Sequence, residues 1–81
     1  MTPRSPDSDA ALDAALLAAH EIGDPAALAG LYGRAADRAH AAGNIDAGCF
    51  FDTQAMVFAL VAGIGGADRH HARLKRHGRD R

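Results

Sequence analysis

Asp52 is the residue whose surroundings most favour chemistry. It lies inside the apolar stretch Ala47–Ala62 (AGCFFDTQAMVFALVA), directly after two phenylalanines. A carboxylate in such a setting must be paired or have a raised pKa, and carboxylates of this kind cluster in functional sites. Arg34 or Arg38 could pair with it, or the side chain could be exposed on a polar strip with the next two residues. We expect a structural pair or exposure, and keep Asp52 as a candidate functional acid.

The histidines lack the spacing of a metal site. Two histidines that bind one ion from a helix face stand four residues apart. His70 and His77 would lie two turns apart, about 10 Å along the axis, which is too far to share an ion. His20, His40 and His77 fall in the predicted last turns of helices, where a cation interacts favourably with the helix dipole. We predict no metal site and no cofactor.

The remaining acidic residues and the single cysteine do not assemble a catalytic motif. Asp9, Asp24 and Asp46 stand at predicted helix starts, where capping explains them. No nucleophile elbow, phosphate-binding loop or dinucleotide fingerprint occurs. We therefore assign no catalytic residue and do not expect an enzyme acting on its own. The alternative is a small enzyme or ligand-binding subunit with a pocket around Asp52 and Tyr32.

Charge is distributed unevenly along the 81 residues. Through Ala62 there are three arginines against eight acidic residues, a net charge of −5, and from Gly63 onward six cations against two aspartates, a net charge of +4. This split indicates attraction between the two parts, or a basic end offered to an acidic partner. The basic segment Arg69–Arg81 could also contact phosphates. It has no aromatic residue for stacking, and the pI is near neutral, so nucleic acid ranks last.

The elements that position these residues are predicted to be four helices. Asp24 suits a helix cap and Pro25 the first helical position. Glycines follow the helices as stop signals, and no segment alternates like a strand. The predicted helices span residues 9–22, 25–42, 47–62 and 67–77, inside one domain (8–78) between a disordered lead-in (1–7) and a tail (79–81). Short loops imply antiparallel neighbours, so we expect an all-α, four-helix up-down bundle.

The predicted third helix, Ala47–Ala62, is apolar nearly all round. Because it is shorter than the roughly 20 residues of a span and contains Asp52, we interpret it as a core helix covered on most sides. We predict no membrane association, and a cytoplasmic location since no signal peptide is evident. Its apolar surface exceeds what alanine-rich neighbours can cover, which predicts self-association. The last helix has a thin stripe, Ala67, His71 and Leu74, and should be the least stable element.

Gly30 and Gly33 lie inside the second predicted helix, where each costs about 1 kcal/mol relative to alanine. The pair favours a tight helix–helix crossing, with close approach of a ligand as the alternative.

The stretch Leu31–Gly78 resembles one unit of the tetratricopeptide-repeat family of helical hairpins. The matching positions are Tyr32, Ala35, Ala36, Ala39, the Gly43-Asn44 turn, Gly48 as the small residue at the crossing, and Ala55. The ending His71–Arg79 resembles a capping helix of such arrays. Asp52 stands where the family places an aromatic residue, and no proline closes the repeat. The resemblance implies a TPR-like helical hairpin array that binds protein or peptide, with a groove near Gly30, Gly33, Asp37 and His40.

These observations favour a small non-catalytic protein-interaction module, accessory subunit or adaptor. The partner would be another protein, or a second copy in a homodimer. The predicted contact residues are Gly30, Gly33, Asp37 and His40, together with Arg69, Arg73 and Arg76 of the last helix.

Overall fold

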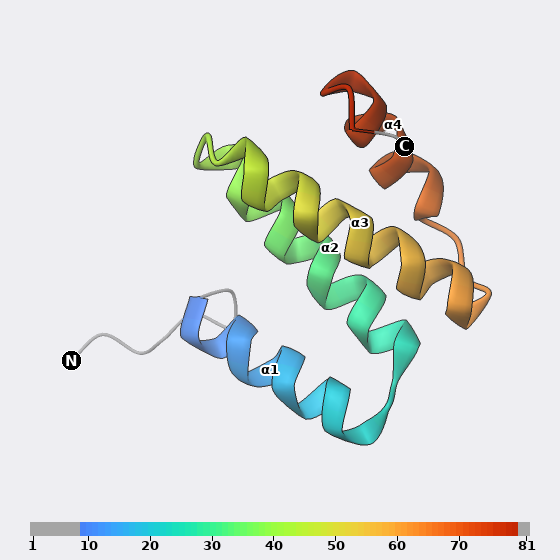
Figure 1. Cartoon of the computed structure of the whole chain (residues 1–81). Helices are drawn as coiled ribbons and strands as arrows, with labels where there is room; N and C mark the ends of the chain where they lie inside the picture. The colour runs from blue at the N-terminus through green and yellow to red at the C-terminus, as the bar shows by residue number, and fades with distance from the viewer. Residues whose placement is uncertain (1–8, 80–81) are drawn as a thin grey trace.

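The computed structural model describes residues 9–79, which form four helices (Figure 1). The helices are α1 (Asp9–Ile22), α2 (Pro25–Ala41), α3 (Ile45–Ala62) and α4 (Ala67–Arg76). No strand occurs among these residues, so the predicted all-α class is confirmed. The predicted lead-in lies outside the described residues.

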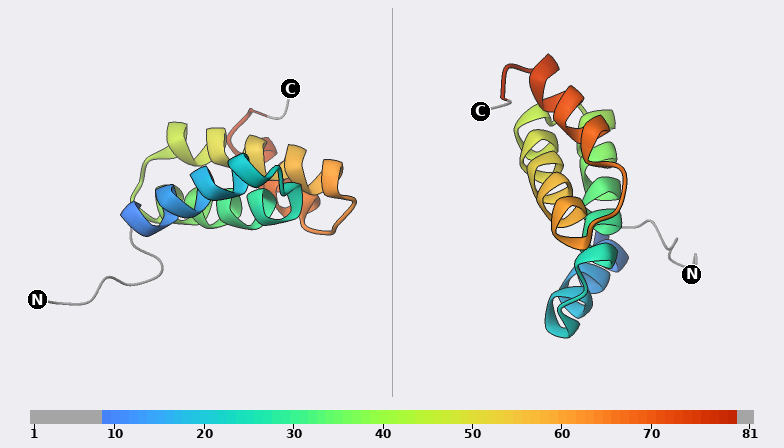
Figure 2. Two further views of the ribbon diagram at one scale, coloured as in Figure 1. Left: turned by 90° about the horizontal axis from the view of Figure 1, so that it is seen from below. Right: turned by 90° about the vertical axis from the view of Figure 1, so that its right-hand side faces the viewer.

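The helices are arranged in chain order. α2 packs between α1 and α3, and α4 packs on α3. Figure 2 shows α1 and α4 on opposite sides of the α2–α3 pair, and α1, α2 and α3 alternate in direction. The closest packing joins α2 to α3 through alanines, with Ala36 and Ala55 at 0% and 1% exposure. Small side chains at this contact let the two helix backbones approach each other closely.

Side-chain caps define the starts of the two central helices. Asp24 accepts a hydrogen bond from the Ala27 N–H at 3.1 Å, with Pro25 at the first helical position, as the sequence predicts. The prediction that Asp46 caps α3 is wrong, because Asn44 accepts the Ala47 N–H at 3.2 Å. Asn44 has the non-helical backbone that a cap requires, whereas Asp46 already lies within the first turn.

An aromatic cluster joins α1, α2 and α3. The ring of Tyr32 on α2 stacks against Phe58 and Phe51 of α3, with centroids 5.8 and 6.1 Å away. His20 of α1 shares a 2.9 Å hydrogen bond with the Tyr32 hydroxyl and meets Phe58 edge-on. α1 therefore contacts the central pair through His20, and Leu12 and Ala19 are the side chains of α1 that are buried.

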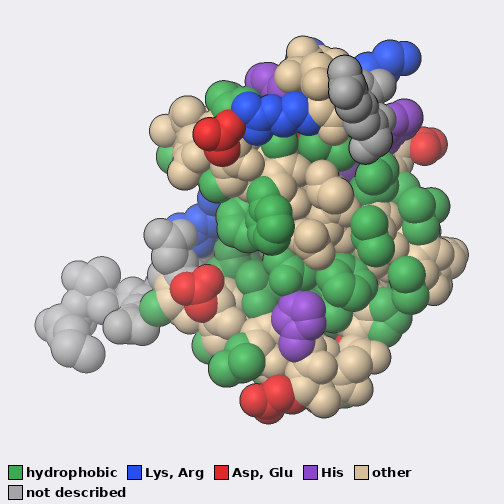
Figure 3. Space-filling model, in the orientation of Figure 1, with side chains coloured by type: hydrophobic (Ala, Val, Ile, Leu, Met, Phe, Trp, Pro, Cys, Tyr) green, Lys and Arg blue, Asp and Glu red, His purple; other side chains and the backbone are tan. Residues whose placement is uncertain are grey.

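The cover over α3, which was predicted to reach most of its sides, is incomplete. Only 28% of its residues are buried, and Figure 3 shows hydrophobic side chains gathered over this helix on the visible face. α2 and α4 cover two sides of α3, which leaves a third side open. By length and composition alone, α3 is also long and apolar enough to cross a membrane.

Two helical glycines have contrasting surroundings. A Cβ atom on Gly48 would lie 2.6 Å from the imidazole of His40, which is far inside a normal contact. Gly48 is therefore the small residue at the α2–α3 crossing. Gly30 has no other group within 4 Å of its Cβ position and is exposed.

Gly48→Ala should lower the free energy of unfolding by about 1 to 3 kcal/mol, because the new methyl group displaces His40. Gly30→Ala is the matched control and should raise it by up to about 1 kcal/mol, because alanine is the better helix former. Urea denaturation of both variants measures the two values. Equal effects of the two substitutions would show that the His40–Gly48 contact is not tight.

Candidate functional site: a buried carboxylate between three helices

The carboxylate of Asp52 is fully buried and accepts four hydrogen bonds. Its Oδ1 atom accepts from His70 Nδ1 at 2.6 Å and from Arg73 Nη2 at 2.7 Å. Its Oδ2 atom accepts from His40 Nε2 at 2.8 Å and from Arg73 Nε at 2.9 Å. The guanidinium of Arg73 thus donates to both oxygens, and this bidentate geometry makes arginine–carboxylate pairs strong.

Three helices place these groups together. Asp52 lies in the middle of α3, and His40 approaches from the last turn of α2, where glycine at position 48 leaves space for its ring. His70 and Arg73 stand three residues apart on α4, so they project from one helix face. Leu74, 3% exposed, follows on the same face and adds the apolar anchor that the sequence predicts.

The network continues to the surface through α2. Asp37 accepts hydrogen bonds from Arg69 Nη1 at 3.1 Å and from Arg73 Nη2 at 3.0 Å. Arg73 therefore bridges the buried Asp52 and Asp37, whose side chain is half exposed.

A second contact lies beyond the end of α4. Arg79 pairs with Asp46 at 2.6 Å, and the ring of His77 stacks on that of His40 with centroids 5.3 Å apart. Arg79, assigned to a tail from the sequence, is thus held to the start of α3. The sequence left two interpretations of the uneven charge: attraction between the acidic and basic parts of the chain, or a basic end offered to an acidic partner. These contacts correspond to the first.

Paired cations control the ionisation of both aspartates. Burial raises the pKa of Asp52, but hydrogen bonds from Arg73, His70 and His40 outweigh it and lower the pKa from 3.8 to about 2. Burial likewise raises the pKa of Asp37, and hydrogen bonds from Arg69 and Arg73 bring it below its usual value. The hydrogen bond to Asp52 raises the pKa of Arg73. The site is therefore an ionised carboxylate beside a charged guanidinium.

This arrangement stabilises the fold and offers little for catalysis. An ionised carboxylate only accepts hydrogen bonds, so His40 must donate from Nε2 and His70 from Nδ1. Both oxygens of Asp52 already have two donors, and its side chain has no contact with solvent. Within residues 9–79, no three His, Cys, Asp or Glu side chains are placed to hold a metal ion.

The partner of Asp52 differs from the one expected. An ion pair was one of two predictions, and it is confirmed, whereas the prediction of an exposed carboxylate is wrong. The arginine is Arg73 of α4, not Arg34 or Arg38 of α2. The prediction that His71 belongs to the apolar stripe of α4 is also wrong. His71 is exposed, and His70, one residue earlier, is the buried histidine.

The two predicted contact surfaces lie largely against each other. Gly33 and Asp37 on α2 meet the α4 residues that bind Asp52 and Asp37. His40 binds the same Asp52 carboxylate and stacks on His77 at the end of α4. A Cβ on Gly33 would lie 3.1 Å from Arg69 Nη2 and 3.4 Å from His70 Nε2, so glycine makes room for α4 side chains. The predicted residues outside this contact are Gly30 and Arg76, both exposed.

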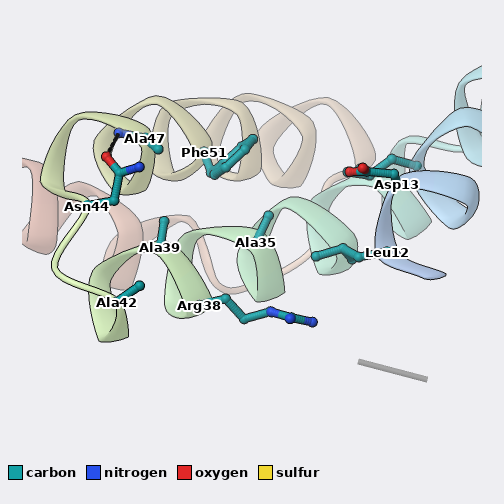
Figure 4. Close-up of a pocket in the computed structure, with 10 residues that line it drawn as sticks. Leu12, Asp13, Ala35, Arg38, Ala39, Ala42, Asn44, Ala47 and Phe51 are labelled. Carbon is teal, nitrogen blue, oxygen red and sulfur yellow. Dashed lines mark hydrogen bonds between the residues drawn. The ribbon is translucent and has the colours of Figure 1, made fainter. Parts of the chain in front are cut away.

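The structure does not support a pocket shared by Asp52 and Tyr32. Tyr32 belongs to the aromatic cluster, and neither residue lines the cavity of about 470 Å³ in Figure 4. That cavity lies between α1, α2 and the start of α3, with an alanine floor. Its lining residues are Leu12, Asp13, Leu16, Ala35, Arg38, Ala39, Ala42, Asn44, Ala47 and Phe51. Ligand binding stays a prediction. This cavity, which is lined by Phe51, the residue next to Asp52 in the sequence, is where a ligand would fit.

Comparisons with protein-family models, with curated proteins and with solved structures find no match for this chain.

Stability should fall in acid because of Asp52. Its pKa is lower in the folded state, about 2, than its usual value of 3.8, so its contribution is present above pH 3.8 and is lost as the pH falls towards 2. The difference corresponds to about 2 kcal/mol. Thermal unfolding followed by circular dichroism between pH 6 and pH 2 measures this loss.

Asp52→Asn removes the titrating group and should flatten the profile over that acid range, if the variant folds. A wild-type profile that is flat between pH 4 and pH 2 would contradict a lowered pKa.

Proposed function

We propose that this protein is a small non-catalytic interaction module that binds another protein through an open apolar face of α3. The face consists of Phe50, Val57, Leu60, Val61 and Ile64, and we call it the α3 face. These side chains are 57%, 44%, 66%, 68% and 44% exposed. Their exposure along one helix is the observation that carries the proposal. Figure 3 shows hydrophobic side chains gathered on this side of the molecule.

The spacing of these residues supports one continuous surface. Phe50, Val57 and Val61 stand at i, i+7 and i+11, which places them in one row along a helix. Leu60 flanks the row, and Ile64 extends it just past the end of α3. Scattered single apolar residues on a surface need no explanation, but a contiguous patch is typical of an interaction site.

The buried network supports the proposal in two ways. It anchors the basic helix α4 beside α3, which leaves the opposite side of α3 open. It also engages the candidate acid of the enzyme alternative, because Asp52 is fully buried with four donors. Nucleic-acid binding through α4 is less favoured, since Arg69 and Arg73 already pair with aspartates.

Leu60→Glu should abolish partner capture, because a charge buried in an apolar interface has no compensating group. The tagged full-length chain is incubated with extract of its native cells under mild conditions, and the captured proteins are identified by mass spectrometry. Ile22→Glu is the matched control, since Ile22 is also an exposed apolar residue, 78% exposed, but lies at the end of α1.

The proposal requires a stoichiometric protein that wild type and Ile22→Glu retain and Leu60→Glu loses. Capture that is equal in all three proteins would exclude the α3 face as the binding surface.

A further inference from the structure

We infer that the α3 face binds a second copy of this chain, so that the protein forms a two-fold symmetric dimer. This inference rests on the proposed function and names the partner. Three properties of the face support it: its lack of charge, its area and the residues along its central row.

The α3 face itself carries no charged side chain, and the nearest charge along the helix, the exposed Asp46 one turn before Phe50, is paired with Arg79. Between Ala47 and Ala67 the only charged residue is Asp52, and its carboxylate is buried among its own partners. Two copies that meet here bring no like charges together and leave no charge without a partner. A strongly acidic or basic partner would find no countercharge on the face. The partner surface that complements the α3 face is therefore apolar and uncharged. The α3 face of a second copy has both properties.

The exposed area matches a small dimer interface. From their exposed fractions and full areas of roughly 150 to 200 Å² each, the five residues of the α3 face expose about 450 to 500 Å² of surface. Two copies would bury roughly twice that area, about 900 to 1,000 Å² in total, which is the size of weak and transient interfaces. The face is therefore large enough for a dimer that forms and dissociates reversibly.

The central row of the face has the pattern of a helix-pairing seam. Phe50, Gln54, Val57 and Val61 stand at i, i+4, i+7 and i+11 along α3. In a two-fold interface the same residues line both sides. Gln54, which is partly exposed, carries both a donor and an acceptor on its amide, so it can pair with a polar group of the other copy. One polar residue in an apolar seam fixes the register of helix pairing.

A lipid surface fits the observations less well. Helices that lie on membranes carry many Lys and Arg side chains on their polar face, whereas α3 has none along its length. Insertion of α3 across a bilayer would pull Asp52 away from Arg73 and the two histidines, or carry those charges into lipid. The helix is long and apolar enough, but its buried ion pairs favour a protein partner.

Sedimentation equilibrium of the full chain tests the inference. We expect a dimer at tens of micromolar for wild type and for the control Ile22→Glu. Val61→Glu and Leu60→Glu should each weaken dimerisation at least tenfold. Circular dichroism establishes whether each variant folds, and the two substitutions at different positions keep the test valid if one does not. A dimer that neither variant weakens would overturn the inference.

A monomeric wild-type protein would also overturn it, and the cause can then be separated. If a monomer captures another protein and Leu60→Glu abolishes this capture, the proposed function stands and only the second copy is wrong. If a monomer captures no protein, both fail. Sedimentation of a monomer with vesicles of phosphatidylcholine and phosphatidylserine, abolished by Val61→Glu, would assign the α3 face to lipid instead.

Discussion

The structure depends on the pairing of the Asp52 carboxylate with Arg73. A buried charge is tolerated only when hydrogen bonds satisfy it, and here four donors from α2 and α4 meet two oxygens on α3. Without the guanidinium, a carboxylate with 0% exposure would be strongly destabilising. The position of α4 follows from this pair, because Leu74 is the one large apolar side chain that the helix buries.

The same arrangement explains why an apolar face stays open. α1 is held at the Tyr32 side of the central pair, and α4 is held over Asp52 and Asp37. Neither helix reaches the row from Phe50 to Val61. Alanine-rich helices bury little surface per residue, so a chain of this length leaves part of its most apolar helix in solvent. We propose that this exposed row is the surface that binds the partner.

The sequence predicts the helices well and the site only in part. Glycine stops and the Asp24-Pro25 start follow from local geometry, which a sequence displays. The charge split and Asp52 inside an apolar stretch also indicate an ion pair. The choice of Arg73 depends on how α4 rotates against α3, and a ten-residue helix with one large apolar anchor does not specify that rotation. For the same reason His71 was expected inside, and His70 is the buried residue. The open side of α3 follows from packing between helices distant in sequence.

Amide hydrogen exchange in α4 tests most directly whether the buried pair holds this helix. Asp52→Asn removes the buried carboxylate charge and leaves Arg73 paired with Asp37 alone, and breaking a buried pair costs about 3 to 5 kcal/mol. Asp37→Asn breaks a half-exposed pair in the same network and should cost less than about 1 kcal/mol. Our account predicts that the amides of residues 70–76 exchange at least tenfold faster in Asp52→Asn than in Asp37→Asn. Equal protection of α4 in the two variants would contradict the central role of Asp52.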